Sequence, residues 1–190
     1  MKLRTWILGL VALSLMASLF AIEDIKAPVP SNKISQATGI NNYGAVTVES
    51  IQATGLIKLN GTFVQNSIYL VGSLLANHAL IGSLEVTGEA NLTDTTVQKT
   101  GFVTGSIQAV RSTFQNPITL LTQKAVFTAS RLEGITFRKD AAFKGKQTLE
   151  LKQGTIVNGP IVFESGKGEV LLYSDSRVLG PVTGGKIVRK

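Results

Sequence analysis

The 190-residue sequence contains no cysteine. This absence excludes disulfide bonds, thiolate metal sites, a cysteine nucleophile and a cysteine that carries a lipid anchor. Small secreted domains often depend on disulfides for their stability. The fold of this chain therefore has to be held together by backbone hydrogen bonds and stacked apolar side chains.

Aromatic and charged residues are also scarce, at 6% and 16% of the chain. The hydrophobic content is 44%, most of it Val, Ile, Leu and Ala, and there are 19 glycines. Such a composition is typical of many short strands joined by tight turns. Beyond Ala21 no segment shows a helical pattern of apolar residues, so we expect an all-β fold.

The segment from Met1 to Ala21 has the pattern of a signal peptide. Lys2 and Arg4 precede an unbroken run of apolar and small residues, Trp6 to Ala21, and the acidic Glu23 and Asp24 follow directly. The run is shorter than the roughly 20 residues of a membrane-spanning helix. We expect cleavage after Ala21 and export to the periplasm or outer surface of a Gram-negative bacterium, with an uncleaved membrane anchor as the alternative.

Residues 22–43 are predicted to form a flexible tether. Pro28 and Pro30 disfavour a helix or a central strand, and Ser, Asn, Gln and Gly fill much of the rest. The expected organisation is a signal peptide at 1–21, the tether at 22–43 and one folded domain at 44–190.

From Val46 onward apolar residues come in pairs two positions apart, and the pairs recur every five or six residues. A period of two indicates strands with one buried face. The spacing is too short for a strand plus a hairpin, but it suits a chain that turns a corner after each short strand. We therefore predict a single-stranded triangular β-helix, or β-solenoid, in which three corners complete a turn of about 17 residues.

This repeat predicts three columns of inward-facing residues, with one member of each column in every turn. The first column is Ile51, Ile68, Leu84, Gly101, Ile118 and Ile135, with Phe102 or Val103 expected to fill the layer of Gly101. The second is Ile57, Leu74, Ala90, Ile107, Ala125 and Ala142. The third is Phe63, Ala79, Val97, Phe114, Leu132 and Leu149. Glycines that suit tight corners precede strands at the same period, at Gly55, Gly72, Gly88 and Gly105.

Three short motifs within this domain resemble those of the bactofilins, a family of bacterial polymer-forming proteins. They are Gly-Ser-Leu-Leu-Ala at 72–76, Gly-Ser-Leu-Glu-Val at 82–86 and Gly-Ser-Ile-Gln-Ala at 105–109. The resemblance implies a short trihelical β-solenoid core and assembly into polymers. Bactofilins are typically cytosolic, so the signal peptide would make this chain an exported variant.

The sequence offers no arrangement of residues that predicts catalysis. His78, the only histidine, is expected at a corner rather than as the catalytic base that solenoid acyltransferases use, and catalytic zinc needs three protein ligands. The twelve acidic residues are scattered, whereas glycoside hydrolysis needs a pair of carboxyl groups. Gly166-Lys167-Gly168 lacks the spacing of a P-loop. We expect no enzyme, metal site or cofactor.

Positive charge gathers in the second half of the chain. Residues 22–100 carry 4 basic and 6 acidic side chains, a net charge of −2, and residues 101–190 carry 13 and 6, a net charge of +7. The basic half is predicted either to be an ordinary solvated face or to attract an anionic envelope polymer or partner protein. Nucleic acid is not expected, because no exposed aromatic residues are predicted to stack bases. The candidate anion-binding or partner-binding residues are Arg138, Lys139, Lys144, Lys146 and Lys152.

The C-terminal end of the solenoid is the predicted site of self-association. An unpaired strand edge recruits further strands, and no helix is predicted to cap this one. The candidate residues are Val182, Ile187 and Val188, with Pro181 and the terminal basic residues as gatekeepers in the alternative.

The expected function is that of a non-catalytic, exported structural or scaffolding protein of the bacterial envelope, which self-associates or docks into a larger assembly. The alternative is a periplasmic binding module, or a subunit of an envelope-spanning secretion complex, that uses a basic face.

Overall fold

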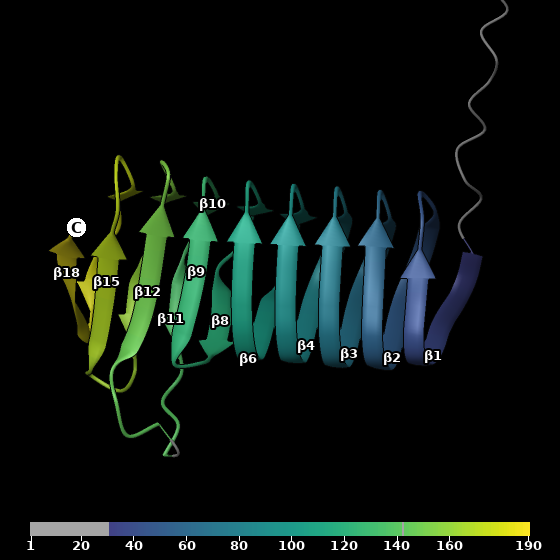
Figure 1. Cartoon of the computed structure of the whole chain (residues 1–190), viewed down its shortest axis with the longest axis horizontal. Coiled ribbons are helices and arrows are strands. Elements are labelled where there is room, and N and C mark those ends of the chain that lie inside the picture. The colour runs from purple at the N-terminus through teal and green to yellow at the C-terminus, as the bar shows by residue number, and fades with distance from the viewer. Residues whose placement is uncertain (1–30, 142) are drawn as a thin grey trace, which may run out of the picture.

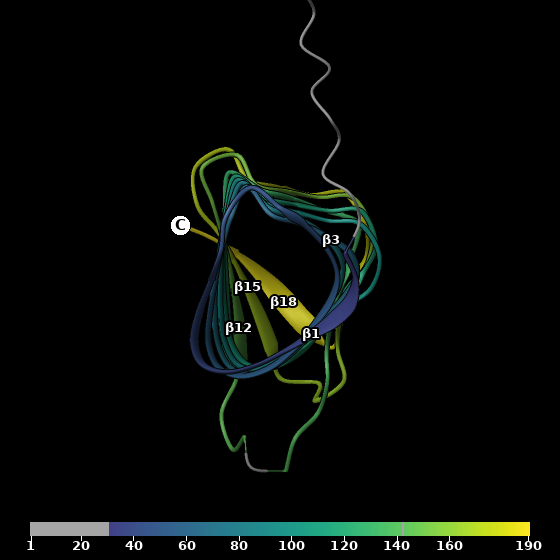
Figure 2. The ribbon, with the colours of Figure 1, turned by 90° about the vertical axis from the view of Figure 1, so that its right-hand side faces the viewer.

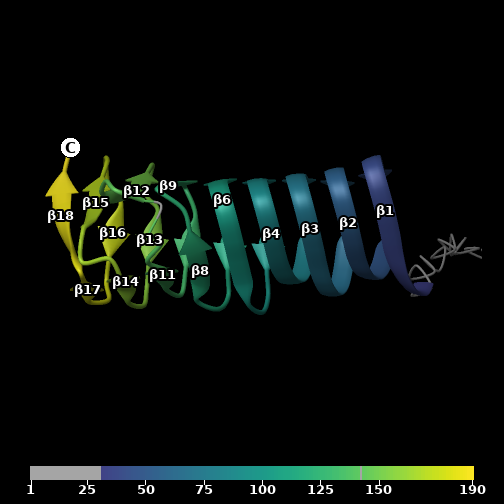
Figure 3. The ribbon, with the colours of Figure 1, turned by 90° about the horizontal axis from the view of Figure 1, so that it is seen from below.

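The chain winds into a β-solenoid whose turns stack along one axis (Figures 1 and 3). The structure, a computed structural model, describes residues 31–141 and 143–190. These residues form strands and connecting turns, with about nine turns of roughly 17 residues each. All the strand pairings between described residues are parallel, and along the axis the turns superpose in one outline (Figure 2). The predicted all-β solenoid is confirmed.

The first four turns each consist of one long strand that bends at its corners, and the later turns divide into shorter strands. The long strands are β1 (Ser31–Tyr43), β2 (Thr47–Asn60), β3 (Phe63–Asn77) and β4 (Leu80–Thr93). The fifth turn contains β5 (Thr96–Val97) and β6 (Gly101–Val110), and the sixth contains β7 (Thr113–Phe114), β8 (Ile118–Leu121) and β9 (Lys124–Thr128). The last three turns contain β10 (Arg131–Leu132), β11 (Ile135–Phe137) and β12 (Gln147–Lys152); β13 (Ile156–Val157), β14 (Ile161–Phe163) and β15 (Gly168–Leu172); and β16 (Arg177–Val178), β17 (Val182–Thr183) and β18 (Gly185–Arg189).

The first predicted column is confirmed at every position, and the second is confirmed down to Ala125. Below Ala125 the second column continues with Leu149. The predicted next member, Ala142, lies outside the described residues. The layer of Gly101 is filled by Ile118, because a Cβ on this glycine would lie only 3.0 Å from Ile118 Cγ1. Phe102 is instead half-buried, and Val103 belongs to another column.

The third predicted column is correct in its middle and wrong at both ends. Val97, Phe114 and Leu132 pair in register. The column begins with Val48, passes through Val64 and Ile81, and continues beyond Leu132 to Val157 and Val178. The predicted Phe63 and Ala79 lie one and two positions away from it, because they occupy the corner. The predicted Leu149 belongs to the second column, because the connection between β11 and β12 is longer than the repeat allows.

Two further columns complete the core. One contains Ala53, Leu70, Val86, Val103, Leu120, Phe137 and Phe163, and the other contains Leu59, Ala76, Leu92, Ala109, Phe127, Leu151 and Leu172. The rings of Phe137 and Phe163 stack with their centroids 4.6 Å apart. All the members of both columns are buried, so each turn covers the inward side chains of the next.

The predicted corner glycines form a ladder in which each backbone occupies the space of a missing side chain. Gly55, Gly72, Gly88 and Gly105 all have positive φ, between 121° and 140°. A Cβ on Gly72 would lie 2.0 Å from the carbonyl oxygen of Gly55, and a Cβ on Gly88 would lie equally close to that of Gly72. Only glycine allows the turns to approach this closely at the corner.

The first described turn corrects the predicted boundary of the domain. The tether was expected to extend to Tyr43, but residues 31–43 form β1, which pairs with β2 over most of its length. Polar residues take two of the apolar column positions here, since Ser35 pairs with Ile51 and Asn41 with Ile57, while Ala37 and Tyr43 continue two other columns. The hydroxyl groups of Ser35 and Tyr43 lie 2.5 Å apart. This turn was missed because it continues the backbone repeat without the apolar pattern.

The predicted signal peptide at residues 1–21 and the tether residues 22–30 lie outside the described residues. Among the residues that the structure does describe, no helix is long and apolar enough to cross a membrane.

Candidate functional site

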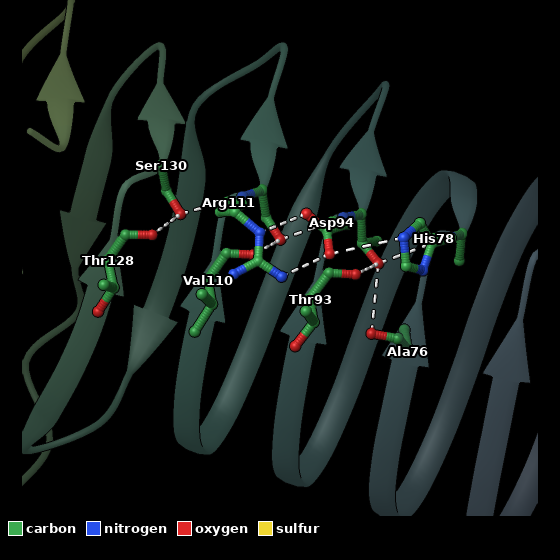
Figure 4. Close-up of polar contacts among 11 residues, drawn as sticks. Ala76, His78, Thr93, Asp94, Val110, Arg111, Thr128 and Ser130 are labelled. Carbon is green, nitrogen blue, oxygen red and sulfur yellow. Dashed lines mark hydrogen bonds and ion pairs between the residues drawn. The ribbon is translucent and has the colours of Figure 1, made fainter. Parts of the chain in front are cut away.

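A column of charged side chains lies along one corner of the solenoid. His78, Asp94 and Arg111 occupy equivalent positions in successive turns, each with φ near 50° (Figure 4). Arg111 donates two hydrogen bonds to Asp94, from Nε to Oδ1 at 2.7 Å and from Nη2 to Oδ2 at 2.6 Å. His78 Nε2 lies 3.6 Å from Asp94 Oδ2. The hydrogen bonds from Arg111 hold the pKa of Asp94 below its usual value.

Behind this charged column runs a ladder of three buried hydroxyl groups, on Thr95, Ser112 and Ser130. Each hydroxyl accepts a hydrogen bond from the backbone N–H of the preceding turn, as Ser112 does from Thr95 and Ser130 does from Ser112. Each also donates to a carbonyl two residues earlier in its own turn, as Thr95 does to Thr93. The ladder thus pairs the backbone groups of the corner. These hydroxyls are buried and hydrogen-bonded to the backbone of their own and the neighbouring turns.

Two Lys–Glu–Lys groups lie side by side on the outer surface of β9, β12, β15 and β18. The Glu150 carboxylate accepts hydrogen bonds from Nζ of Lys124 and Nζ of Lys152, each at 2.7 Å. Glu169 Oε1 lies 3.4 Å from Nζ of both Lys146 and Lys186. Desolvation raises the pKa of both carboxyl groups, but the lysines outweigh it and leave each pKa below its usual value. We call this surface the basic face; it consists of Lys124, Lys146, Glu150, Lys152, Glu169 and Lys186.

The strands of the basic face are adjacent and in register. Lys124 pairs with Thr148, Thr148 with Glu169, and Glu169 with Lys186. Four lysines against two glutamates leave a net charge of +2 on the face. By contrast, the outward positions of β8, β11 and β14 carry uncharged residues such as Thr119, Thr136 and Val162.

A basic loop at residues 138–146 projects from the corner beside this face, between β11 and β12 (Figures 1 and 2). Its base is held by Gln147, which is only 1% exposed. The Gln147 amide donates to the carbonyls of Thr122 and Arg138, and its oxygen accepts from Ser165 Oγ. Gln147 therefore ties the loop to the turns above and below it.

The structure separates the five predicted anion-binding residues into two groups. Arg138, Lys139 and Lys144 lie in the basic loop, whereas Lys146 and Lys152 pair with glutamates on the basic face. Phe143 lies between them in the sequence and is half-buried in the loop.

Sequence reasoning missed three lysines at the same surface. Lys124 and Lys186 belong to the basic face, and Lys167 borders a surface hollow of about 420 Å³ together with Lys146 and Lys186. Their positions follow from strand register, which residue spacing alone did not give because the loop interrupts the repeat.

The last turn, β16–β18, ends three of the inward columns with apolar residues that are incompletely covered, whereas the column of Leu172 ends at Arg189. Val178 and Val182 are partly buried, and Ile187, which pairs with the buried Val170, is 46% exposed. Of the predicted association residues, Val182 and Ile187 therefore lie at the end of columns. Val188 pairs with Leu171 on the outer surface instead. Val178 was missed.

No group of three or more His, Cys, Asp or Glu side chains among residues 31–141 and 143–190 is placed to hold a metal ion. Compared with known protein families, curated proteins and solved structures, the chain matches none of them.

Proposed function

We propose that this chain is a non-catalytic scaffolding rod, exported to the bacterial envelope, which self-associates through its last turn. The observation that carries the proposal is the pattern of residues on β16, β17 and β18. Each of these strands has one apolar inward-facing residue that is incompletely covered, and Arg189 takes the inward position next to Leu172 at the end of β18. With about nine turns and a strand spacing of about 4.8 Å, one chain spans about 43 Å, and an end-to-end pair would span twice that length.

The backbone groups of the same residues face the open edge. Lys190 N donates to Leu172 O, and Gly168 N donates to Gly184 O, so even-numbered residues of this segment bond back to β15. Neighbouring residues in a parallel strand point their N–H and C=O groups to opposite sides. The N–H and C=O of Ile187 therefore face away from β15.

Val178 and Val182 are placed in the same way. The N–H groups of Arg177 and Leu179 donate to the preceding turn, and Pro181 O accepts from Ile161 N. Val178, between Arg177 and Leu179, and Val182, next to Pro181, therefore present their own N–H and C=O groups to the open edge. At all three strands, one residue thus offers both an apolar side chain and an unpaired backbone.

A second copy related by a twofold axis fits this edge. Such an axis through the middle of β18 would pair β18 with its copy in antiparallel fashion, and β16 with β17 of the copy. Ile187 would then face Ile187 of the second copy, and Val178 would face Val182, with each pair exchanging two backbone hydrogen bonds. Lys186 would face Val188, and Arg189 would face Gly185, so this register sets no two like charges directly opposite.

Head-to-tail stacking fits less well. Continuing the columns into β1 of another copy would place Val182 against Ser35 and Ile187 against Asn41. This arrangement would bury polar side chains against apolar ones without partners, which is unfavourable. The resemblance to the polymer-forming bactofilins supports self-association, and the geometry of the last turn favours a closed dimer.

Sedimentation velocity on the expected mature chain, Ile22 to Lys190, tests the proposal. We expect a monomer–dimer equilibrium that shifts to the monomer in Ile187→Lys. The matched control is Val71→Lys, because Val71 is 44% exposed on a lateral face and should behave as wild type. Added salt should strengthen the dimer by screening the basic ends. A strictly monomeric wild type would contradict self-association, and species that grow without limit would contradict the twofold arrangement.

A further inference from the structure

Seven of the thirteen basic residues in the second half of the chain belong to the basic face or to the adjoining loop, which also carries Asp140. The basic face contributes Lys124, Lys146, Lys152 and Lys186, and the adjoining loop contributes Arg138, Lys139 and Lys144. The neighbouring outer surface of β8, β11 and β14 is uncharged at its paired positions. A potential concentrated on one side attracts an anion to that side alone.

The lysines of the basic face are arranged along the axis of the rod. Lys124, Lys152 and Lys186 belong to β9, β12 and β18, and Lys146 directly precedes β12. From β9 to β18 the face extends over about 14 Å at the usual strand spacing. The basic loop lies beside this line, at the corner that leads into β12 (Figure 1). A ligand that contacts all of these cations at once has to be extended and to carry several negative charges.

Glu150 and Glu169 hold the lysine ammonium groups in place and leave some of their N–H donors free for a ligand. Each ammonium has three N–H donors, and its contact with Glu150 or Glu169 engages only part of this capacity. The lysine side chains remain 39% to 66% exposed. Lysines that are already held in place lose less conformational freedom when a ligand binds.

We propose that the basic face and the loop at residues 138–146 bind a linear polyanion that lies along the solenoid axis, such as a polysaccharide bearing carboxylate, sulfate or phosphate groups. Its anionic groups contact Lys124, Lys152 and Lys186 on the face and Lys139 and Lys144 at the loop. Lys186 belongs to the last turn, but its side chain contacts Glu169 on the lateral face, so the rod can associate through its end and bind the polymer along its side.

The test is isothermal titration of the mature chain with a heparin oligosaccharide as the linear polyanion. We expect binding at low salt that weakens steadily as salt is added. The variant Lys124→Gln, Lys152→Gln, Lys186→Gln should lower the affinity by at least about tenfold. A control with the same loss of charge away from this side of the solenoid, Lys99→Gln, Arg131→Gln, Arg177→Gln, should bind within about twofold of wild type.

A second variant keeps the test valid if the loss of lysines around Glu150 and Glu169 disturbs folding. Lys139→Gln, Lys144→Gln, Lys167→Gln leaves both Lys–Glu–Lys groups intact and should also weaken heparin binding. Equal losses of heparin affinity in the control and in both test variants would overturn the proposal. The absence of heparin binding at low salt would also overturn it. Binding to phosphatidylglycerol vesicles without binding to heparin would also overturn it, in favour of a membrane surface.

Discussion

Replacement of Gly72 by alanine tests the corner ladder, on which the close stacking of the turns depends. Gly72 has a φ of 140°, and an added Cβ would lie 2.0 Å from the carbonyl oxygen of Gly55. Backbone strain of this kind costs about 1–3 kcal/mol for a residue other than glycine. The clash adds to this strain, because a backbone carbonyl cannot rotate away as a flexible side chain can. We expect Gly72→Ala to lower the free energy of unfolding by about 3 kcal/mol or more.

Two other glycines separate the causes of this effect. Gly166 also has positive φ, at 68°, but an added Cβ there would meet nothing within 4 Å, so Gly166→Ala should show strain without the clash. Gly145 has neither feature and should tolerate alanine. Thermal unfolding followed by circular dichroism should therefore rank the losses as Gly145, Gly166 and then Gly72. A decrease of about 3 kcal/mol corresponds to about 6–12 °C in Tm for a domain of this size. If Gly72→Ala melts together with Gly145→Ala, the close contact between the turns does not exist.

Three further predictions concern the core, the charged corner and the loop. Leu74→Asp should abolish cooperative unfolding, because Leu74 is fully buried. Leu75→Asp should retain cooperative unfolding, because the neighbouring Leu75 is 36% exposed. Equal effects of the two variants on the melting curve would show that the register is wrong. The lowered pKa of Asp94 means that its ionised form stabilises the fold at neutral pH, and this contribution is lost as pH falls below about 4. The Tm difference between wild type and Asp94→Asn should therefore shrink between pH 7 and pH 3. A constant difference would contradict the ion pair. Gln147→Leu should destabilise the domain by about 1–3 kcal/mol and speed tryptic cleavage in the loop after Arg138, and unchanged cleavage would contradict its role as a clamp.

The repeat of the core could be predicted from the sequence wherever apolar spacing and strand register agree. The column from Ile51 to Ile135 was found because its members recur at an almost constant spacing along the chain. The third column failed at the seventh turn, because the loop at residues 138–146 lengthens that turn and moves Leu149 into the second column. Nothing in the apolar pattern shows where an insertion begins.

The first turn and the basic face were harder to predict, for different reasons. In β1, Ser35 and Asn41 occupy inward positions that are apolar in later turns, so a search for apolar pairs could not detect the strand. The basic face depends on pairing across the inserted loop, which brings Lys124 and Lys152 to one carboxylate, Glu150, although they are far apart in sequence. The identities of the charged residues were visible in the sequence, but their partners required the register.

The measurement that tests the in-register stack most directly is disulfide trapping, since the natural chain has no cysteine to compete. Thr87 pairs with Thr104 on neighbouring turns, which places their Cα atoms about 4.8 Å apart, within the range that a disulfide can bridge. Under mild oxidation, Thr87→Cys with Thr104→Cys should form an intramolecular disulfide, seen as a mobility shift on a non-reducing gel. Thr87→Cys with Phe102→Cys is two residues out of register, with Cα atoms about 8 Å apart, and should not form one. Failure of the first pair, or equal reaction of the second, would contradict the stacked solenoid.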